Sequence, residues 1–384
     1  MPNLLIAHGG APTAVINASL YGAVCEAKKH PEVAHIYGAR HGSAGILAED
    51  FLDLSAVEEQ QLALLPFTPA SAIGTSRTPL EEKDYAAMRA VLEKHDVRYV
   101  LFNGGNGSMD TCGKLKKACE GSDICVCGIP KTIDNDIAVI DHAPGYGSAA
   151  RYIAQCTADA AADVRALPIH VCVIEAMGRN AGWIAAASAL AREQAGDAPD
   201  LIYLPEVPFD EADFLRRVKQ LHTEKGGVVV VASEGLRNAL GEPIVPPIFT
   251  SGRATYSGDV SAHLANLVIQ KLGIKARSEK PGLLGRASSA LQSPQDREEA
   301  IRMGALAAQA VLSGQSGVMA GMLRRSTAPY AVEDVLVPIE QVMLEERKMP
   351  AEFLAPDGCG VTQAFCDWCR PLLGGPLARY ARLD

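Results

Sequence analysis

Short apolar runs that end in polar, glycine-rich loops recur along this chain, and each loop leads toward a segment of helical character. Residues 98–102 form one such run and are followed by a loop at 103–111, and residues 124–127 form another, followed by a loop at 128–137. Strands that alternate with helices in this way build a parallel sheet, whose strands end at one common edge. The chain is therefore expected to be an α/β protein with its functional side chains at that edge.

The length indicates more than one lobe. At 384 residues the chain is long for a single hydrophobic core. An apolar fraction of 48% with only 5% aromatic residues, together with 35 glycines, fits an alanine- and valine-rich α/β protein with tight turns. Further strand-like runs at residues 170–175, 201–204 and 228–232 predict a second parallel sheet.

Charge and cysteine usage exclude several classes of protein. The net charge of −9 argues against nucleic acid or an anionic membrane as the main partner. No basic leader, signal peptide or membrane span is recognisable, which predicts a cytoplasmic protein. Most of the ten cysteines lie in apolar runs and are expected to be reduced. Cys366 and Cys369 have the spacing of zinc ligands, but no second pair or nearby histidine completes a site.

The loop at residues 128–137 carries the strongest chemical signal in the chain. It holds Asp134 and Asp136, with Lys131 and Thr132 just before them. One carboxylate can accept a proton from a hydroxyl, the other can order a metal ion, and the lysine can neutralise charge that builds on a phosphate. The alternative is a polar turn in which Asp and Asn side chains hydrogen-bond to their own backbone. The decapeptide alone leaves both interpretations open.

Three more loops contain glycines that suit phosphate binding. Residues 8–13 and 103–108 each follow a predicted strand and precede a helix, where backbone N–H groups can bind an anion. Residues 74–79 contain Arg77 as their only cation, which could meet a phosphate or simply face solvent. None of the loops has the Walker A pattern or the dinucleotide fingerprint. Glycine spacing alone therefore does not identify the ligand.

Together these motifs resemble those of the phosphofructokinase family. The segments that carry the resemblance are, in chain order, Gly9–Gly10, Gly104–Ser108, Pro130–Asp136, Met177–Gly178–Arg179, Glu234 and Arg277–Arg286. The match covers most of residues 3–325, and its central motif, Thr132-Ile133-Asp134-Asn135-Asp136, is highly specific. The tail looks like that of the pyrophosphate-using bacterial branch.

The resemblance implies roles on the acceptor side. Asp134 would be the general base that takes the proton from the sugar 1-hydroxyl, supported by Asp136, while Thr132 would touch the transferring phosphate and Lys131 would complete the catalytic group. The fructose ring would be held by Met177, Gly178, Arg179 and Glu234, and the sugar 6-phosphate by Arg277 and Arg286.

The donor side follows from the same resemblance. It would be lined by Gly10, Arg77, Gly105, Asn106, Gly107 and Ser108. Mg2+ is the expected cofactor, with Asp136 and, more weakly, Asn106 as candidate ligands, because ATP-using members usually have Asp where this chain has Asn106. Pyrophosphate users typically carry Asp at the position of Gly107, which excludes a nucleotide, whereas Lys131 is typical of the pyrophosphate type. The open space beside Gly107 favours ATP, with pyrophosphate as the alternative donor.

Two departures from the family pattern concern the sugar. Leu283 stands where the family usually has His or Tyr near the 6-phosphate, and His170 stands where many members have an Arg that reaches into a neighbouring subunit. These changes weaken the expectation for fructose 6-phosphate and admit sedoheptulose 7-phosphate as a second acceptor. A non-catalytic sensor of sugar phosphates or nucleotides is a further alternative, although it would not need both aspartates. An NAD-kinase-like enzyme is disfavoured by Arg179 and the 132–136 motif.

The implied fold is two doubly wound, Rossmann-like lobes with mostly parallel sheets and an active site in the cleft between them. The donor-binding lobe is expected at residues 1–142, with about 278–320 returning to it. The sugar-phosphate-binding lobe is expected at 143–277, and residues 321–384 are expected to pack on the lobes as a C-terminal extension. The family also implies a homodimer or homotetramer.

Overall fold

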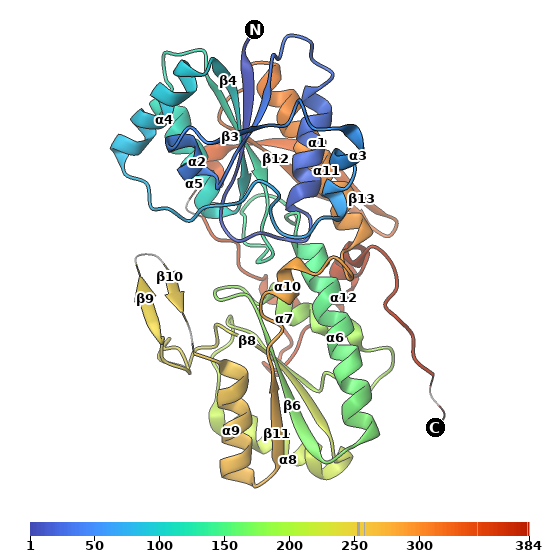
Figure 1. Ribbon diagram of the computed structural model, residues 1–384. Helices are drawn as coiled ribbons and strands as arrows, with labels where there is room; N and C mark the ends of the chain where they lie inside the picture. Colours follow the sequence, from blue (N-terminus) through green and yellow to red (C-terminus); the bar gives the residue numbers. More distant parts are fainter. Residues whose placement is uncertain (252–253, 257, 344, 382, 384) are drawn as a thin grey trace. The chain divides into compact units, whose positions relative to one another are not determined.

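The chain forms two compact units, each built around its own sheet (Figure 1). The computed structural model describes residues 1–251, 254–256, 258–343, 345–381 and 383. The first unit comprises Met1–Ser148 and Arg286–Arg347, and the second comprises Ala149–Gly285 and Lys348–Asp384. The chain thus leaves the first unit after Ser148 and returns at Arg286, whereas the sequence placed these two crossings after residues 142 and 277.

The first unit contains a 7-stranded sheet with the order β13-β12-β5-β4-β1-β2-β3. Its strands are β1 Asn3–His8, β2 Ile36–Ala39, β3 Phe51–Asp53, β4 Val97–Gly104, β5 Cys125–Pro130, β12 Val318–Thr327 and β13 Tyr330–Pro338. All neighbours pair in parallel except β3 with β2 and β13 with β12. Every residue of β1 is buried, because helices cover both faces of the sheet. Residues beyond 320, expected to be an extension, supply most of β12 and all of β13.

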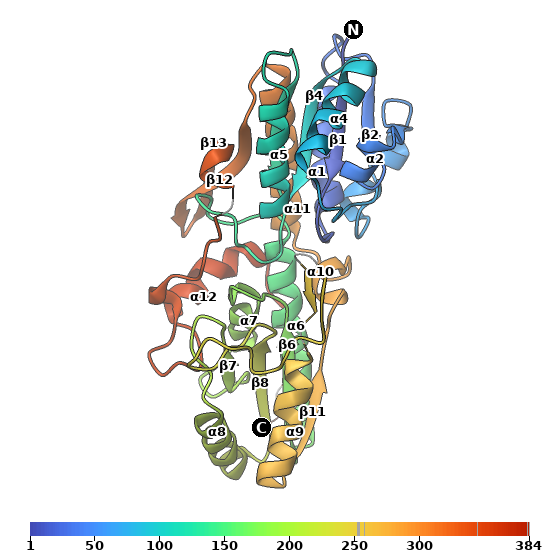
Figure 2. The same ribbon diagram turned by 90° about the vertical axis from the view of Figure 1, so that its left-hand side faces the viewer.

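Helices cover both faces of this sheet (Figures 1 and 2). On one face α1 and α11 pack through Leu20 and Met303, and on the other α4 and α5 pack through Met88 and Met109. The helices of this unit are α1 Ile16–Ala27, α2 Ser43–Leu47, α3 Glu59–Leu62, α4 Glu82–Lys94, α5 Asn106–Ala118 and α11 Pro294–Leu312.

Two glycines bring α1 and α11 unusually close. A Cβ atom on Gly22 would lie 1.9 Å from the carbonyl oxygen of Ile301, and one on Gly304 would lie 1.9 Å from that of Ser19. Only glycine fits at such backbone contacts. The approach fixes the position of α11 against the sheet.

The second unit contains a 4-stranded parallel sheet with the order β11-β6-β8-β7. Its strands are β6 His170–Ala176, β7 Leu201–Tyr203, β8 Val228–Ser233 and β11 Lys275–Glu279, and a separate antiparallel pair is formed by β9 Phe249–Ser251 and β10 Ala254–Tyr256. Phe214 and Leu264 anchor α8 and α9 to one face. The helices that begin or lie in this part of the chain are α6 Tyr146–Ala166, α7 Trp183–Ala187, α8 Glu211–Lys225, α9 Val260–Leu272, α10 Leu284–Ala287 and α12 Gln363–Cys369.

The C-terminal segment of the second unit is held by an aromatic cluster. The ring of Trp183 lies 5.0 Å from that of Trp368 and 6.1 Å from that of Phe353, measured between centroids. Trp183 is on α7 and Trp368 is on α12, so the cluster joins the tail to the sheet-covering helix.

The described residues contain neither a membrane-spanning helix nor a cluster of metal ligands. No helix there is long and apolar enough to cross a membrane. All ten cysteines are free thiols, and burial raises the pKa values of Cys127 and Cys172 to about 12. Within the same ranges, no group of three or more His, Cys, Asp or Glu side chains is arranged to hold a metal ion.

Candidate active site

The carboxyl ends of three neighbouring strands bring the predicted loops together. Strands β1, β4 and β5 lie side by side and are parallel, with Ala7 opposite Phe102 and Phe102 opposite Gly128. Backbone hydrogen bonds continue past the strand ends, from Gly9 N to Asn103 O (2.9 Å) and from Lys131 N to Gly104 O (3.0 Å). The expectation that the loops after β4 and β5 open at one edge of the sheet is confirmed.

Glycine is required where these loops meet. A Cβ atom on Gly104 would lie 2.0 Å from Ser108 Oγ, and one on Gly9 would lie 2.2 Å from the same oxygen. Gly10 adopts a φ of +76°, a conformation that favours glycine. Gly105 precedes the first turn of α5, so the N–H groups of that turn can serve an anion at this edge.

The loop that carries Arg77 is tied to the first glycine loop. Gly10 N donates to Ser76 O (3.1 Å), and Thr75 Oγ1 donates to Gly10 O (2.7 Å). These contacts hold the exposed Arg77 next to the glycine loop, where the sequence had left an ordinary surface arginine as the alternative.

Lys131 lies beneath the glycine loop. Its side chain is almost fully buried, and Nζ donates to Gly9 O (2.9 Å) and Ala11 O (2.5 Å). The pKa of Lys131 is lowered to about 7, chiefly by burial; Arg77 and Arg286 contribute to the lowering, while Asp134 and Asp136 oppose it. These charged groups therefore share one electrostatic environment.

The two aspartates of the 132–136 motif are held differently. Asp136 accepts hydrogen bonds from Thr132 Oγ1 (3.2 Å) and Asn106 Nδ2 (2.9 Å), while Asp134 N donates to Thr132 Oγ1 (3.0 Å). Burial raises the pKa of Asp136, and its hydrogen bonds partly oppose that rise. Thr132 therefore links the aspartates, and Asn106 joins the motif to the loop after β4.

Residues 143–145, which follow the motif in the chain, form hydrogen bonds with it. Asn135 has a φ of +52°, and its Oδ1 accepts a hydrogen bond from Ala143 N (3.1 Å). Thr132 N donates to Pro144 O (3.1 Å), and Thr132 also bridges to Gly145. The sequence indicated a break at residues 141–148 but gave no sign of this support.

The oxygen atoms at this site fit Mg2+. Asn106 Oδ1 is buried and has no hydrogen-bond partner within the described ranges, and the same side chain contacts the Asp136 carboxylate. Mg2+ prefers one or two protein oxygen ligands together with substrate phosphates. Asn106 turns its Nδ2 toward Asp136, so the pair Asn106 and Asp136 suits this ion once the amide turns its Oδ1 to the same side.

The second unit gathers most of the predicted sugar-binding residues. Met177, Gly178 and Arg179 follow β6, and Glu234 follows the neighbouring β8. Gly178 N donates to Glu234 Oε1 (3.3 Å), and a Cβ atom on Gly235 would lie 1.7 Å from Arg179 O. Met177 also lines a small depression of about 20 Å³.

The two predicted 6-phosphate residues belong to different units. Arg277 lies opposite Cys172 on the exposed edge strand β11, roughly 16 Å along the sheet from the loop that begins at Met177. Arg286 belongs to the first unit; burial lowers its pKa, Arg77 lowers it further, and Asp134 opposes the shift. The structure therefore brings Arg286 to the donor-side charges of the first unit and, within the second unit, leaves Arg277 away from Met177.

The structure reveals an ion pair that the sequence reasoning missed. Lys280 Nζ lies 2.8 Å from Glu175 Oε1, and Glu175 Oε2 accepts a hydrogen bond from Val260 N (2.7 Å) at the start of α9. The pair fixes the segment before Pro281 and Gly282, which line the same depression as Met177. A lysine next to a Pro-Gly turn was the only signal in the sequence.

Comparison with known proteins identifies the family. The family model for phosphofructokinase matches residues 3–311. The chain belongs to the phosphofructokinase family. A pyrophosphate–fructose 6-phosphate 1-phosphotransferase of Xanthomonas campestris pv. campestris is 41% identical, over 98% of this chain and 93% of that protein. One of Rhodospirillum rubrum is 38% identical, over 97% and 94%.

A solved structure agrees with this membership. The crystal structure of a pyrophosphate-dependent phosphofructokinase from Marinobacter aquaeolei has a TM-score of 0.89 at 34% identity, covering 99% of this chain and 94% of that one. The expected phosphofructokinase fold is confirmed, and the chain is a phosphotransferase with an alcohol group as acceptor. These relatives are named for pyrophosphate, so they do not support the preference for ATP that Gly107 suggested.

Proposed function

We propose that this phosphofructokinase transfers a phosphoryl group from pyrophosphate to the 1-hydroxyl of fructose 6-phosphate, giving fructose 1,6-bisphosphate. The observation that carries the proposal is the buried Lys131 side chain under the glycine loop, whose Nζ donates to Gly9 O and Ala11 O. The negative charge of a bound donor favours the ammonium form of this lysine. Pyrophosphate has no nucleoside and must be bound through its phosphates alone, so its site needs a fixed cation. The names of the relatives from Xanthomonas and Rhodospirillum point to the same donor.

The residues of the first unit are proposed to divide the work of phosphoryl transfer. Asp134 takes the proton from the acceptor hydroxyl, and Thr132 contacts the transferring phosphate and holds Asp134 through its backbone N–H. Lys131 and Arg77 oppose the charge that develops on the phosphate oxygens. Asn106 and Asp136 would hold Mg2+, which would supply further neutralisation of the donor phosphates.

The residues of the second unit are proposed to hold the sugar. Glu234 and the backbone at Gly178 are already joined by a hydrogen bond, which orders the loop that carries Met177 and Arg179. Aligning the acceptor hydroxyl in this way lowers the entropic barrier of the reaction. Fructose 6-phosphate is the proposed acceptor, and sedoheptulose 7-phosphate is the second acceptor to test.

ATP is the second candidate donor because of one specific observation. A Cβ atom on Gly107 would have nothing within 4 Å, so the space that an Asp side chain would fill is open. An added carboxylate there would repel the α-phosphate of a nucleotide. Lys131 therefore favours pyrophosphate as the donor, whereas the open space beside Gly107 favours ATP.

The donor test uses purified protein with Mg2+ and fructose 6-phosphate, and measures fructose 1,6-bisphosphate formed with pyrophosphate or ATP. We expect kcat/KM for pyrophosphate to exceed that for ATP at least about tenfold, about 1.4 kcal/mol of discrimination. Gly107→Asp should lower any remaining turnover with ATP and should leave turnover with pyrophosphate unchanged. Faster turnover with ATP would overturn the proposed donor, and sugar-phosphate binding without turnover of either donor would favour a sensor.

The oligomeric state and the cellular location of the protein are proposed from its family membership. Arg277 is exposed on the edge strand β11, away from Met177, and fits a role in the sugar site of a second copy. We therefore propose a homodimer or homotetramer in the cytoplasm. Sedimentation of the purified protein tests the assembly, and a monomer that is fully active would refute a shared site.

A further inference from the structure

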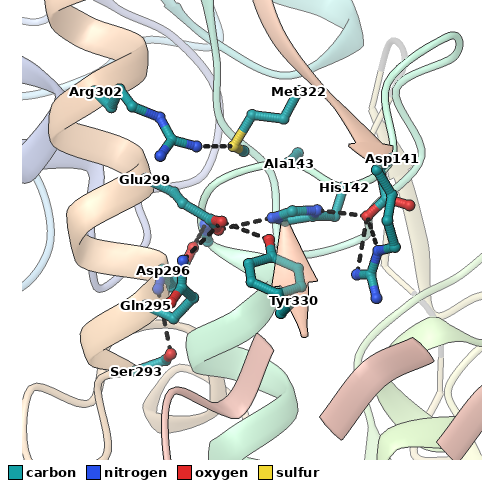
Figure 3. Close-up of polar contacts among 12 residues, drawn as sticks. Asp141, His142, Ala143, Ser293, Gln295, Asp296, Glu299, Arg302, Met322 and Tyr330 are labelled. Carbon is teal, nitrogen blue, oxygen red and sulfur yellow. Dashed lines mark hydrogen bonds and ion pairs between the residues drawn. The ribbon is translucent and has the colours of Figure 1, made fainter. Parts of the chain in front are cut away.

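Two carboxylates of α11 hold the segment that supports the catalytic motif (Figure 3). Asp296 and Glu299 lie one helical turn apart, and each is only 1% exposed. Both residues lie outside the segments that carry the resemblance to the phosphofructokinase family. Both point from α11 toward residues 141–148, which follow the Thr132–Asp136 motif.

Asp296 is the more direct of the two contacts. Its Oδ1 accepts a hydrogen bond from Gly145 N (2.8 Å), and its Oδ2 accepts from Ser148 N (2.9 Å) and Ser148 Oγ (2.5 Å). Three donors converge on one buried carboxylate, an arrangement that costs desolvation unless every bond is made. The Ser293 hydroxyl in turn accepts from Asp296 N (3.2 Å) at the start of the helix.

Glu299 holds the other end of the same segment. Its Oε2 lies 2.7 Å from His142 Nε2, and its Oε1 accepts from Tyr330 and from Gln295 Nε2 (2.9 Å). The opposite ring nitrogen of His142 lies 2.8 Å from Asp141 Oδ2. The segment is therefore fastened to α11 at both ends.

The fastened segment is also the one that contacts Thr132. Thr132 N donates to Pro144 O, and Thr132 bridges to Gly145, whose N–H is bound by Asp296. A displacement of Gly145 would therefore displace Thr132. The Thr132 hydroxyl in turn accepts a hydrogen bond from Asp134 N. We propose that Asp296 is a positioning residue for phosphoryl transfer, which acts through Gly145 to fix Thr132 and the base Asp134. This inference rests on the proposed function of that loop.

The test compares two buried aspartates that both accept a backbone N–H. Asp296→Asn keeps the shape but places an amide N–H against one of the three donors. Asp200→Asn is the control, because Asp200 accepts from Val229 N (2.8 Å) and pairs with Lys225 (2.5 Å), and both partners belong to the second unit. Since misplacement by about 1 Å can lower a rate by about 100-fold, we expect kcat to fall at least about tenfold in Asp296→Asn only, with KM within about twofold.

Hydrogen exchange of the peptide spanning residues 128–148 gives a second readout that does not need activity. We expect its amides to exchange faster in Asp296→Asn and to be unchanged in Asp200→Asn. Equal kcat in the two variants, or a loss of kcat without faster exchange, would overturn the positioning role. If wild type turns over no donor, the proposed function fails, and unchanged exchange would separately overturn the role of Asp296.

A milder variant covers the case in which Asp296→Asn does not fold. Ser148→Ala removes one donor to Asp296 and leaves the two backbone bonds. It should lower kcat about threefold, within the range of one lost hydrogen bond, and speed exchange of the same peptide. No change in either measurement would refute the inference.

Discussion

His142 should make the stability of the first unit strongly dependent on pH. The imidazole is buried, and burial favours its neutral form, but Glu299 and Asp141 outweigh burial and raise its pKa from the usual 6.5 to about 9. At about 1.4 kcal/mol per pKa unit, this rise corresponds to about 3 kcal/mol of stability. Because the folded-state pKa is raised, that stability is complete below pH 6.5 and is lost as the pH rises through 9. Arg324, which also contacts Asp141, stays charged throughout.

The assay is urea unfolding of wild type and His142→Gln at pH 6 and pH 9.5. Wild type should lose about 3 kcal/mol more than the variant between the two pH values, because only wild type carries the titrating imidazole. Both tryptophans, Trp183 and Trp368, lie in the second unit, so their fluorescence serves as an internal reference while circular dichroism reports both units.

A control variant separates this ion pair from histidine content in general. His35 lies 2.8 Å from Asp53 and is half exposed, so His35→Gln removes a surface pair that contributes little. It should show the same pH dependence as wild type. The reasoning is refuted if His142→Gln and wild type lose equal free energy of unfolding between pH 6 and pH 9.5.

Two further predictions concern the donor loops. Lys131→Met should lower kcat with pyrophosphate by about 10² to 10³-fold, as for other preorganised groups that stabilise charge, and should leave the circular dichroism spectrum unchanged. A decrease in kcat of less than about threefold would show that Lys131 is not part of the catalytic group. Gly104→Ala should lower the free energy of unfolding by about 1 to 3 kcal/mol, because its Cβ would lie 2.0 Å from Ser108 Oγ. Gly107→Ala, where the Cβ meets nothing within 4 Å, is the matched control in thermal unfolding, and equal effects would contradict the steric argument.

Much of the candidate site could be predicted because its residues are close to one another in the sequence. The 128–137 loop contains the catalytic candidates Lys131, Thr132, Asp134 and Asp136 within a few residues of one strand end. Parallel pairing of β4 and β5 then brings Asn106 to Asp136, as the common edge of the sheet requires. Local patterns were sufficient for these contacts.

Arg277 and Arg286 show what sequence spacing leaves open. They are close in sequence and are predicted to bind the same phosphate; Arg277 lies on the exposed edge strand of the second unit, and Arg286 belongs to the first. The chain passes between the units within this short segment. Sequence spacing does not reveal such a crossing, because both residues lie in polar stretches with no distinguishing period.

The sequence by itself determined the α/β class, the parallel sheets and the loops at which chemistry would gather. Short apolar runs bounded by turn residues favour buried strands, and glycines after them permit close backbone approach, so these features follow from short-range sterics and hydrophobicity. Tertiary structure alone decided that β12 and β13 complete the first sheet and that Asp296 and Glu299 of α11 hold the segment behind Thr132. Those contacts join residues more than a hundred positions apart, and packing between α1 and α11 selects them.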